Sequence, residues 1–379
     1  MEVFIVNKLQ EPDLDFIRYV KKAGGADLKK CYQCATCSVV CELSPEHKPF
    51  PRKEMIWAAW GQKERLIKDP DVWLCHQCND CTTHCPRGAR PGDVLAAVRS
   101  YVFNENSFPR FMGRALASPK ALPILFLVPI IVIGAIMFGF ADFDAVDMSM
   151  GAAVDYNEFI RHGWTEGLFI GGNILIFAFA AVGLMRFWKG LKKSFPDHEG
   201  PGFIPSAIKA VKEIVTHENF GKCVTNKPRQ YAHFMVLFGF LGSMATAGLA
   251  LMWTVVLGHH SPIDLPNLIK VLGSVSGLAL LVGLAIIFIR RFGDRDKIGA
   301  NGYSDWLFLY ILAAVGFTGL ILQFLRMGGL AAAAYITYFI HLVFVFFLLW
   351  YAPYSKFAHM FYRTLAMIYA KSIDRKPRE

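Results

Sequence analysis

Charged residues are scarce in this chain. Asp, Glu, Lys and Arg make up 18% of the 379 residues, whereas hydrophobic residues make up 54%. This balance is unusual for a soluble enzyme and favours a membrane protein. The opening "MEVFIVNKLQEPDLDF" has neither a basic start nor a long apolar run, so it does not predict a secretory signal. We therefore expect the first domain to remain in the cytoplasm.

A dinucleotide-binding fingerprint is also missing. No glycine-rich pattern follows a predicted strand. We therefore expect flavin binding and substrate reduction to reside on partner subunits. The net charge of +10 is unevenly spread, and the hydrophobic stretches are nearly free of charge. Such a distribution indicates membrane topology rather than nucleic-acid binding.

Six apolar stretches follow the first 110 residues, at about 121–141, 167–187, 231–257, 268–289, 305–325 and 332–351. Each is long enough to cross roughly 30 Å of hydrocarbon as a helix. The sequence thus predicts an all-α membrane protein with a soluble domain at 1–110 and a six-span helical bundle at 111–379. Within the soluble domain we expect helices near Pro12–Ala23 and Arg52–Trp60.

Charge in the loops predicts the orientation. The segments after the second and fourth stretches are rich in Lys and Arg, whereas the segment 142–166 is mainly acidic. Basic loops face the cytoplasm, so both termini and the first domain are expected on the cytoplasmic side of the inner membrane. The long inner loop contains "FIPSAIKAVKEIV", whose apolar residues recur at helical spacing. This pattern predicts an amphipathic helix that lies on the membrane or docks a partner.

Two runs of four cysteines dominate the soluble part. Both follow C-x-x-C-x-x-C-x-x-x-C, in "CYQCATCSVVC" and "CHQCNDCTTHCP". This is the spacing of bacterial two-[4Fe–4S] ferredoxins, in which three cysteines wrap one cluster and the fourth reaches the other. We expect that fourth cysteine to start a helix. One cluster is thus assigned to Cys31, Cys34, Cys37 and Cys85, and the other to Cys75, Cys78, Cys81 and Cys41.

Two zinc sites are the alternative interpretation of the cysteine runs, because C-x-x-C pairs also bind zinc. Zinc needs four ligands per site, however, and gives no reason for a third cysteine that follows each pair at the same short spacing. The duplicated run of four therefore favours two [4Fe–4S] clusters.

Histidines inside apolar stretches are costly and are therefore functional candidates. His341 lies in the sixth stretch, and His359 follows 18 residues later near its inner end. A continuous helix would make five turns over that separation and place both rings on one face, roughly 27 Å apart. This arrangement suits two haems stacked across a bilayer. His233, near the inner start of the third stretch, lies at a depth where it can face His359. The alternative is that each histidine hydrogen-bonds a neighbouring helix.

Four arginines lie at the inner ends of the predicted spans: Arg229, Arg290, Arg291 and Arg363. They can pair with haem propionates, but we expect most of them to be solvated charges of the inner face.

The cysteine runs resemble those of HdrC, an iron–sulfur subunit of heterodisulfide reductases. From about Lys227 to Ala370 the chain is similar to the cytochrome b gamma subunit of respiratory nitrate reductases (NarI) and to the HdrE protein of membrane heterodisulfide reductases. The fusion of the two parts resembles the quinone-interacting membrane-bound oxidoreductase (Qmo) family of dissimilatory sulfur metabolism.

This resemblance implies b haems and their ligands. His233 and His359 would hold an inner haem b, and His341 would supply one ligand of an outer haem. The family expects a second histidine about three turns after His233, where this chain has Ser243. We expect His162 to replace it, with His260 in reserve. A five-coordinate outer haem, or none, is the alternative.

The resemblance also implies a function. The chain would exchange electrons between menaquinone or another quinone, the haems and the two [4Fe–4S] clusters. It would pass them to the HdrA-like flavoproteins QmoA and QmoB and to adenosine-5′-phosphosulfate reductase. No CCG-type cysteine motif is present, so we do not expect disulfide reduction on this chain.

Three other classes remain as alternatives. These are a haem-free membrane anchor for a ferredoxin domain, the membrane module of a heterodisulfide reductase, and a transporter. A transporter requires polar or broken spans at the midplane, which these stretches do not show.

Overall fold

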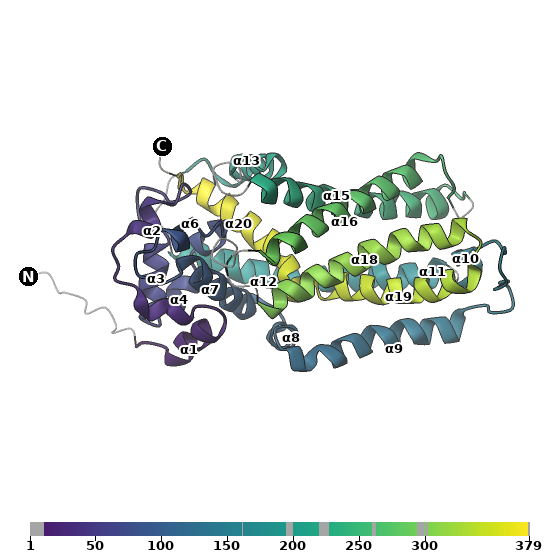
Figure 1. Ribbon diagram of the computed structural model, residues 1–379, viewed down its shortest axis with the longest axis horizontal. Coiled ribbons are helices and arrows are strands. Elements are labelled where there is room, and N and C mark those ends of the chain that lie inside the picture. Colours follow the sequence, from purple (N-terminus) through teal and green to yellow (C-terminus); the bar gives the residue numbers. More distant parts are fainter. Residues whose placement is uncertain are drawn as a thin grey trace, which may run out of the picture.

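The computed structural model describes residues 11–160, 162–194, 200–219, 227–259, 263–293, 299 and 302–377, with the side chains of His162 and Lys227 excepted. Within these ranges the regular elements are helices, and β-structure is limited to two isolated bridges. The all-α prediction is therefore confirmed. The short N-terminal helices gather at one end of the molecule and the long helices extend from them (Figure 1).

The soluble part is built from short helices around one longer one. These are α1 (Leu14–Lys22), α2 (Thr36–Val39), α3 (Arg52–Ala59), α4 (Lys63–Ile67), α5 (Asp71–Leu74), α6 (Asp80–Thr83), α7 (Pro91–Asn106) and α8 (Arg110–Leu116). Val94, Val98 and Val102 of α7 recur every four residues, so they form one apolar stripe, and they are fully buried against Phe16 and Val20 of α1. The helices expected near Pro12–Ala23 and Arg52–Trp60 are confirmed as α1 and α3.

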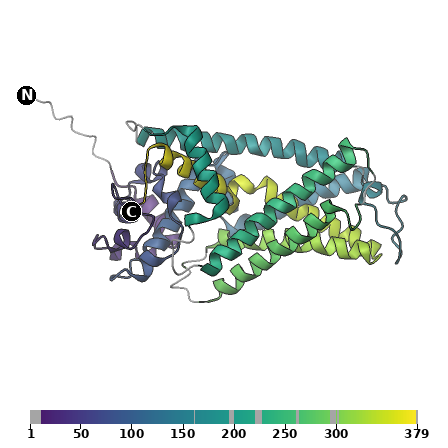
Figure 2. The same cartoon turned by 90° about the horizontal axis from the view of Figure 1, so that it is seen from above.

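Among the residues that the structure describes, six helices are long and apolar enough to cross a membrane, judged by length and composition. Their α-helical parts are α9 (Leu122–Phe140), α12 (Gly172–Ser194), α15 (Lys227–Leu251), α16 (Leu268–Arg291), α18 (Tyr303–Met327) and α19 (Ala331–Trp350). Turned by 90°, the molecule shows the long helices side by side and the N-terminal part at one end (Figure 2). The chain therefore has the architecture of a multi-pass membrane protein.

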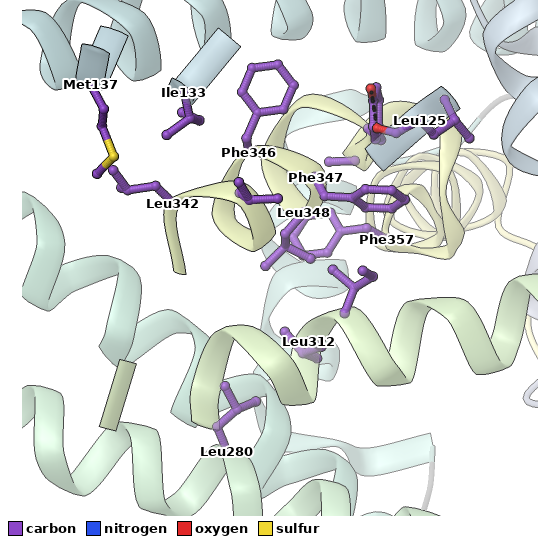
Figure 3. Packing of buried hydrophobic residues seen from close by; sticks show 14 of the residues in the cluster. Leu125, Ile133, Met137, Leu280, Leu312, Leu342, Phe346, Phe347, Leu348 and Phe357 are labelled. Carbon is purple, nitrogen blue, oxygen red and sulfur yellow. Dashed lines mark hydrogen bonds between the residues drawn. The ribbon is translucent and has the colours of Figure 1, made fainter. Parts of the chain in front are cut away.

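The bundle core forms where α9 packs against α19. Leu125, Ile133 and Met137 of α9 are spaced by eight and four residues along one face, and they belong to one buried cluster with Leu342 and Phe346 of α19 (Figure 3). Many large hydrophobic side chains on the other faces of these helices are exposed. An apolar exterior of this kind matches contact with lipid rather than with water.

The sixth long helix does not continue to His359. It ends at Trp350, and two short 3₁₀ turns, η6 (Ala352–Tyr354) and η7 (Lys356–Ala358), precede a separate helix, α20 (His359–Ser372). Pro353 explains the break, because its ring clashes with the preceding turn and it has no N–H for the helix ladder. The expectation that one continuous helix places His341 and His359 on the same face is therefore wrong.

The C-terminal helix α20 joins the two parts of the molecule. The ring of Tyr362 stacks on Trp73 of the soluble part with centroids 5.2 Å apart, and Phe187 of α12 meets the same tyrosine at 5.4 Å. All three residues belong to one buried cluster. The predicted boundary near residue 110 thus falls between two parts that share a core.

The segment between α12 and α15 contains the helix expected from its periodicity, α13 (Phe203–Thr216). Ala210 on one face is buried against Met367 and Ile368 of α20. The predicted apolar stripe, formed by Ile204, Ile208, Val211 and Val215, is exposed.

Candidate metal centres

The two cysteine runs fold into loops of the same backbone shape. Gln33 and Ala35 in the first run have φ angles of 62° and 68°, and Gln77 and Asn79 at the same positions of the second run have 51° and 69°. Residues with a Cβ rarely adopt this left-handed region. The repeated pair of left-handed residues curls each loop so that its first three cysteines line one cavity.

The loops gather the eight cysteines into two sets. Cys31, Cys34, Cys37 and Cys85 line one cavity. Cys41, Cys75, Cys78 and Cys81 line the other. Each set contains three cysteines of one run and the fourth of the other run, which is the grouping that the spacing predicts. All eight are unbridged thiols.

The sulfur environment suits bound metal. The backbone N–H of Gln77 donates to Cys75 Sγ at 3.3 Å, and that of Ala89 donates to Cys85 Sγ at 3.4 Å. Burial raises the pKa of the Cys37 thiol to about 11 and also raises the pKa of Cys41. Burial thus disfavours a bare thiolate at Cys37 and Cys41, and a bound cation such as the iron of a cluster would compensate its charge.

The fourth cysteine of each run does not start a helix, contrary to expectation. Cys41 follows the end of α2 at Val39, and Cys85 follows the end of α6 at Thr83. The short helix that contains the third cysteine carries the chain over to the other cavity. The next long helix, α7, begins only at Pro91, after the left-handed Arg90.

The second cysteine loop lies directly on the membrane part. Arg363 of α20 donates to the carbonyl of Cys75 at 3.3 Å and also contacts the ring of His76. Arg229, at the start of α15, donates to the carbonyl of Gln77 at 2.7 Å. Neither arginine is the solvated charge that the sequence predicted, since each bonds the backbone of this loop.

The first cysteine loop faces away from the membrane part. Cys34 is exposed, as are 68% of the Tyr32 surface and 67% of the Val39 surface. The guanidinium of Arg87 lies 4.0 Å from the centre of the Tyr32 ring. This loop is therefore accessible to another protein, whereas Cys75 and Cys81 of the second loop are buried.

His233 and His359 lie beside the second loop. His233 of α15 lies within electrostatic range of His359 of α20 and of His76. His359 Nδ1 lies 2.5 Å from the carbonyl of Lys356, and His233 Nδ1 lies 2.9 Å from His217 Nε2. Burial lowers the pKa of His359 to about 4, so its ring is neutral at pH 7. In both rings Nδ1 is engaged, and Nε2 is the nitrogen suited to coordinate iron.

The Nδ1 atom of His341 on α19 is also engaged by a neighbouring oxygen. His341 Nδ1 lies 2.8 Å from Thr318 Oγ1 of α18, and that hydroxyl donates to the carbonyl of Ala314 at 2.6 Å. The threonine oxygen can therefore accept the Nδ1 proton of His341 and hold the ring with Nε2 toward the bundle. Gly319 is the next residue, and a Cβ added there would lie 3.2 Å from His341 Cε1. These donor sets fit haem held through neutral imidazole.

The partner of His341 at an outer haem is expected to be His162 or His260. The side chain of His162 and all of His260 lie outside the part of the chain that the structure describes. His162 begins α11 (His162–Glu166), and Thr165 of this helix hydrogen-bonds Tyr338, which precedes His341 by one turn. The hydroxyl of Ser243 donates to the carbonyl of Gly239 at 2.9 Å, so its hydrogen bond is made within α15.

Two site residues escaped the sequence analysis. His76 and His217 are not predicted as site residues by the sequence, yet only 8% and 3% of their surfaces are exposed. His217 hydrogen-bonds His233, and His76 contacts Arg363, which lies one turn after His359. The position of His76 between Cys75 and Cys78 was a signal for the first, but no periodicity marked the second.

The family comparisons match both parts of the chain. The model of the citrate utilization protein B family matches residues 116–379, and that of the 4Fe-4S dicluster domain matches residues 27–89. The first match covers more than half of the chain, so the protein belongs to the citrate utilization protein B family. Its N-terminal part is a 4Fe–4S dicluster domain.

The curated relatives match the N-terminal part. The C-subunit of the H(2):CoB-CoM heterodisulfide,ferredoxin reductase of Methanothermobacter marburgensis is 36% identical over 104 residues, which are 27% of this chain and 54% of that protein. A heterodisulfide reductase C-subunit-like protein of Archaeoglobus profundus is 34% identical over 87 residues, 23% of this chain and 46% of that protein. The chain thus spans about half the length of the curated relatives it matches. No solved structure matches significantly.

Proposed function

We propose that this protein is a membrane electron-transfer subunit, which exchanges electrons between the quinone pool and flavoprotein partners in the cytoplasm. One observation carries the proposal: the buried cysteine loop at Cys75 is bonded to α15 and α20, the helices that hold His233 and His359. The similarity to iron–sulfur subunits of heterodisulfide reductases supports a role in a reductase-type complex.

The chain would hold four groups in sequence. Two [4Fe–4S] clusters would take Cys31, Cys34, Cys37 and Cys85, and Cys75, Cys78, Cys81 and Cys41. An inner haem b would take His233 and His359, and an outer haem b would take His341 with His162. When bound, these groups supply one-electron carriers between a two-electron quinone and a two-electron flavin.

The protein's own residues prepare this path. Arg99 donates to the carbonyls of Val72 and Cys75 at 3.0 Å and 2.9 Å, and it fixes the second loop against α7. Arg363 remains a cation, because burial lowers its pKa only to about 10. Its charge next to Cys75 favours an added electron in this cavity. The buried aromatic cluster of Trp73, Phe187 and Tyr362 excludes water from the junction.

The partners follow from the exposed first loop. We assign it as the contact for HdrA-like flavoproteins, in the Qmo arrangement QmoA and QmoB, which pass electrons on to adenosine-5′-phosphosulfate reductase. The apolar bundle and its basic inner loops support a cytoplasmic-membrane location with the iron–sulfur domain and both termini in the cytoplasm.

A second candidate rests on the family match. The family that covers residues 116–379 is described by citrate utilization. This description favours a route in which a cytoplasmic enzyme oxidises a tricarboxylate and the electrons enter the quinone pool. The same path would then run in the opposite direction. The catalytic partner that copurifies with the chain distinguishes the two candidates.

The test is a redox-titrated visible spectrum of the purified chain with haem counted per polypeptide. We expect two b-type haems with separate midpoints and quinol-driven reduction of both clusters. His233→Ala should remove the inner haem and stop cluster reduction by quinol, whereas His47→Ala at an exposed position should change neither. Absence of any b-type absorbance would leave a haem-free anchor and overturn the proposal.

A further inference from the structure

The ring of His217 is held firmly at the end of α13. The backbone of His217 is left-handed, with φ 52°, and only 3% of the surface of this residue is exposed. Two contacts fix α13 against α20: the ion pair of Glu213 with Lys371 at 2.6 Å and the burial of Ala210. Gln230 of α15 also donates to the carbonyl of His217 at 3.4 Å. The backbone of His217 is thus anchored by contacts with α15 and α20.

The contacts of this ring define one consistent set of protons. His217 Nδ1 lies 3.4 Å from the carbonyl of Val215, and a carbonyl can only accept, so Nδ1 carries the proton. The neutral ring then has a lone pair on Nε2, which lies 2.9 Å from His233 Nδ1. His233 therefore donates its Nδ1 proton to His217. This is the tautomer that directs His233 Nε2 toward iron.

We propose that His217 is a positioning residue for the inner haem, which fixes the tautomer and orientation of His233 and raises the electron donation of its ring. The inference rests on the proposed haem ligation by His233. A ligand that shares its Nδ1 proton with an acceptor is a stronger base, and a stronger base stabilises the oxidised iron. His217 thus lowers the reduction potential of the inner site.

The experiment compares acceptors at position 217 in the full-length chain. In His217→Phe no acceptor remains, and we expect the oxidised-to-reduced ratio of the inner haem to fall about tenfold at fixed ambient potential, which is a rise of 59 mV in its midpoint. His217→Gln keeps a carbonyl oxygen and should shift the ratio by less than half as much on the logarithmic scale. The largest g value of the oxidised haem should change in the same order.

A merely structural histidine would give a different result. Equal potentials in wild type and fully loaded His217→Phe would overturn the inference, and so would equal shifts in the Phe and Gln variants. If the Phe variant does not fold, His217→Glu replaces it, and its stronger acceptor should lower the potential below that of wild type. Equal potentials in the Glu and Gln variants would then contradict the inference. A wild-type chain without an inner haem would instead refute the proposed function.

Discussion

Arg363 and Cys75 are 288 residues apart in the chain, yet the guanidinium of the first donates to the carbonyl of the second at 3.3 Å. Arg363 is one helical turn after His359 on α20, so the same helix face serves both residues. The contact connects the candidate haem ligand to the candidate cluster loop through a single turn of helix. It makes the second cysteine set the one nearest the membrane part.

Removal of the Arg363 charge should change the potential of the adjacent cluster. In Arg363→Met the reduced, more negative cluster loses a buried cation, so we expect the midpoint of that cluster to fall by roughly 60 mV, a tenfold change in its equilibrium. Redox titration followed by EPR measures this shift.

Arg363→Lys is the matched control, because it keeps the charge but not the fork of donors. It should retain most of the wild-type potential. A potential that is unchanged in the Met variant would show that this arginine does not act on the cluster electrostatically.

The crossed grouping of the cysteines predicts the outcome of paired substitutions. Cys31 and Cys85 line one cavity, so Cys31→Ser combined with Cys85→Ser should remove a single cluster. Cys31 and Cys41 belong to different cavities, so their combined substitution should affect both clusters. Iron content and EPR of the two double variants, measured side by side, give the answer, and the reverse pattern would mean that each run binds its own cluster.

The outer site should respond separately from the inner one. His341→Phe should remove the outer haem and leave the spectrum of the inner haem in place. Thr318→Val removes the hydroxyl at 2.8 Å from His341 Nδ1, so the haem should remain but its midpoint should rise. Haem counts with redox titration of both variants test this assignment, and an unchanged haem count in His341→Phe would refute it.

A buried acidic cluster predicts a pH dependence of stability. Glu54, Asp69 and Asp71 lie around the Lys53 ammonium, which is 2.5 Å from Asp69 and 2.7 Å from Asp71. Arg375 of the C-terminal segment pairs with Asp71. Two cations therefore balance two carboxylates, and burial raises the pKa of the third, Glu54, to about 8.

The sign follows from proton binding. The folded state keeps the Glu54 proton up to about pH 8, whereas the unfolded state loses it near pH 4.3. The free energy of unfolding should therefore fall as pH rises through this interval, by at most about 1.4 kcal/mol per pH unit. Thermal unfolding between pH 5 and 8 measures the slope, and Glu54→Gln should flatten it. A slope of equal size in that variant would assign the effect to other groups.

The sequence was informative where the physical constraint is local. Cysteine spacing sets which side chains can share a cavity, and the structure places the eight cysteines in the two predicted sets. Apolar length likewise predicted the six long helices. The break before His359 was missed, although Pro353 marks it in "YAPYS", because the spacing of His341 and His359 was read as one helix.

Long-range contacts left no local signal. His217 meets His233 only because α13 folds back against α20 and α15, and Arg363 meets Cys75 only through the packing of Tyr362 on Trp73. Neither contact follows from periodicity, since each depends on how helices far apart in the sequence pack. The sequence does not predict the contact of Arg363 with the Cys75 loop, because the positive-inside pattern explains a basic residue at this position equally well.

The short 3₁₀ turns between α19 and α20 also separate His359 from a tilt of α19 that a change in bilayer thickness would cause. Helices of a bundle tilt to match the local thickness of the hydrocarbon layer. His341 moves with α19 when that happens. His359 and Arg363 lie beyond the break, on a helix whose Tyr362 is packed into the soluble part. We therefore expect the spacing between His359 and the Cys75 loop to stay constant when α19 tilts.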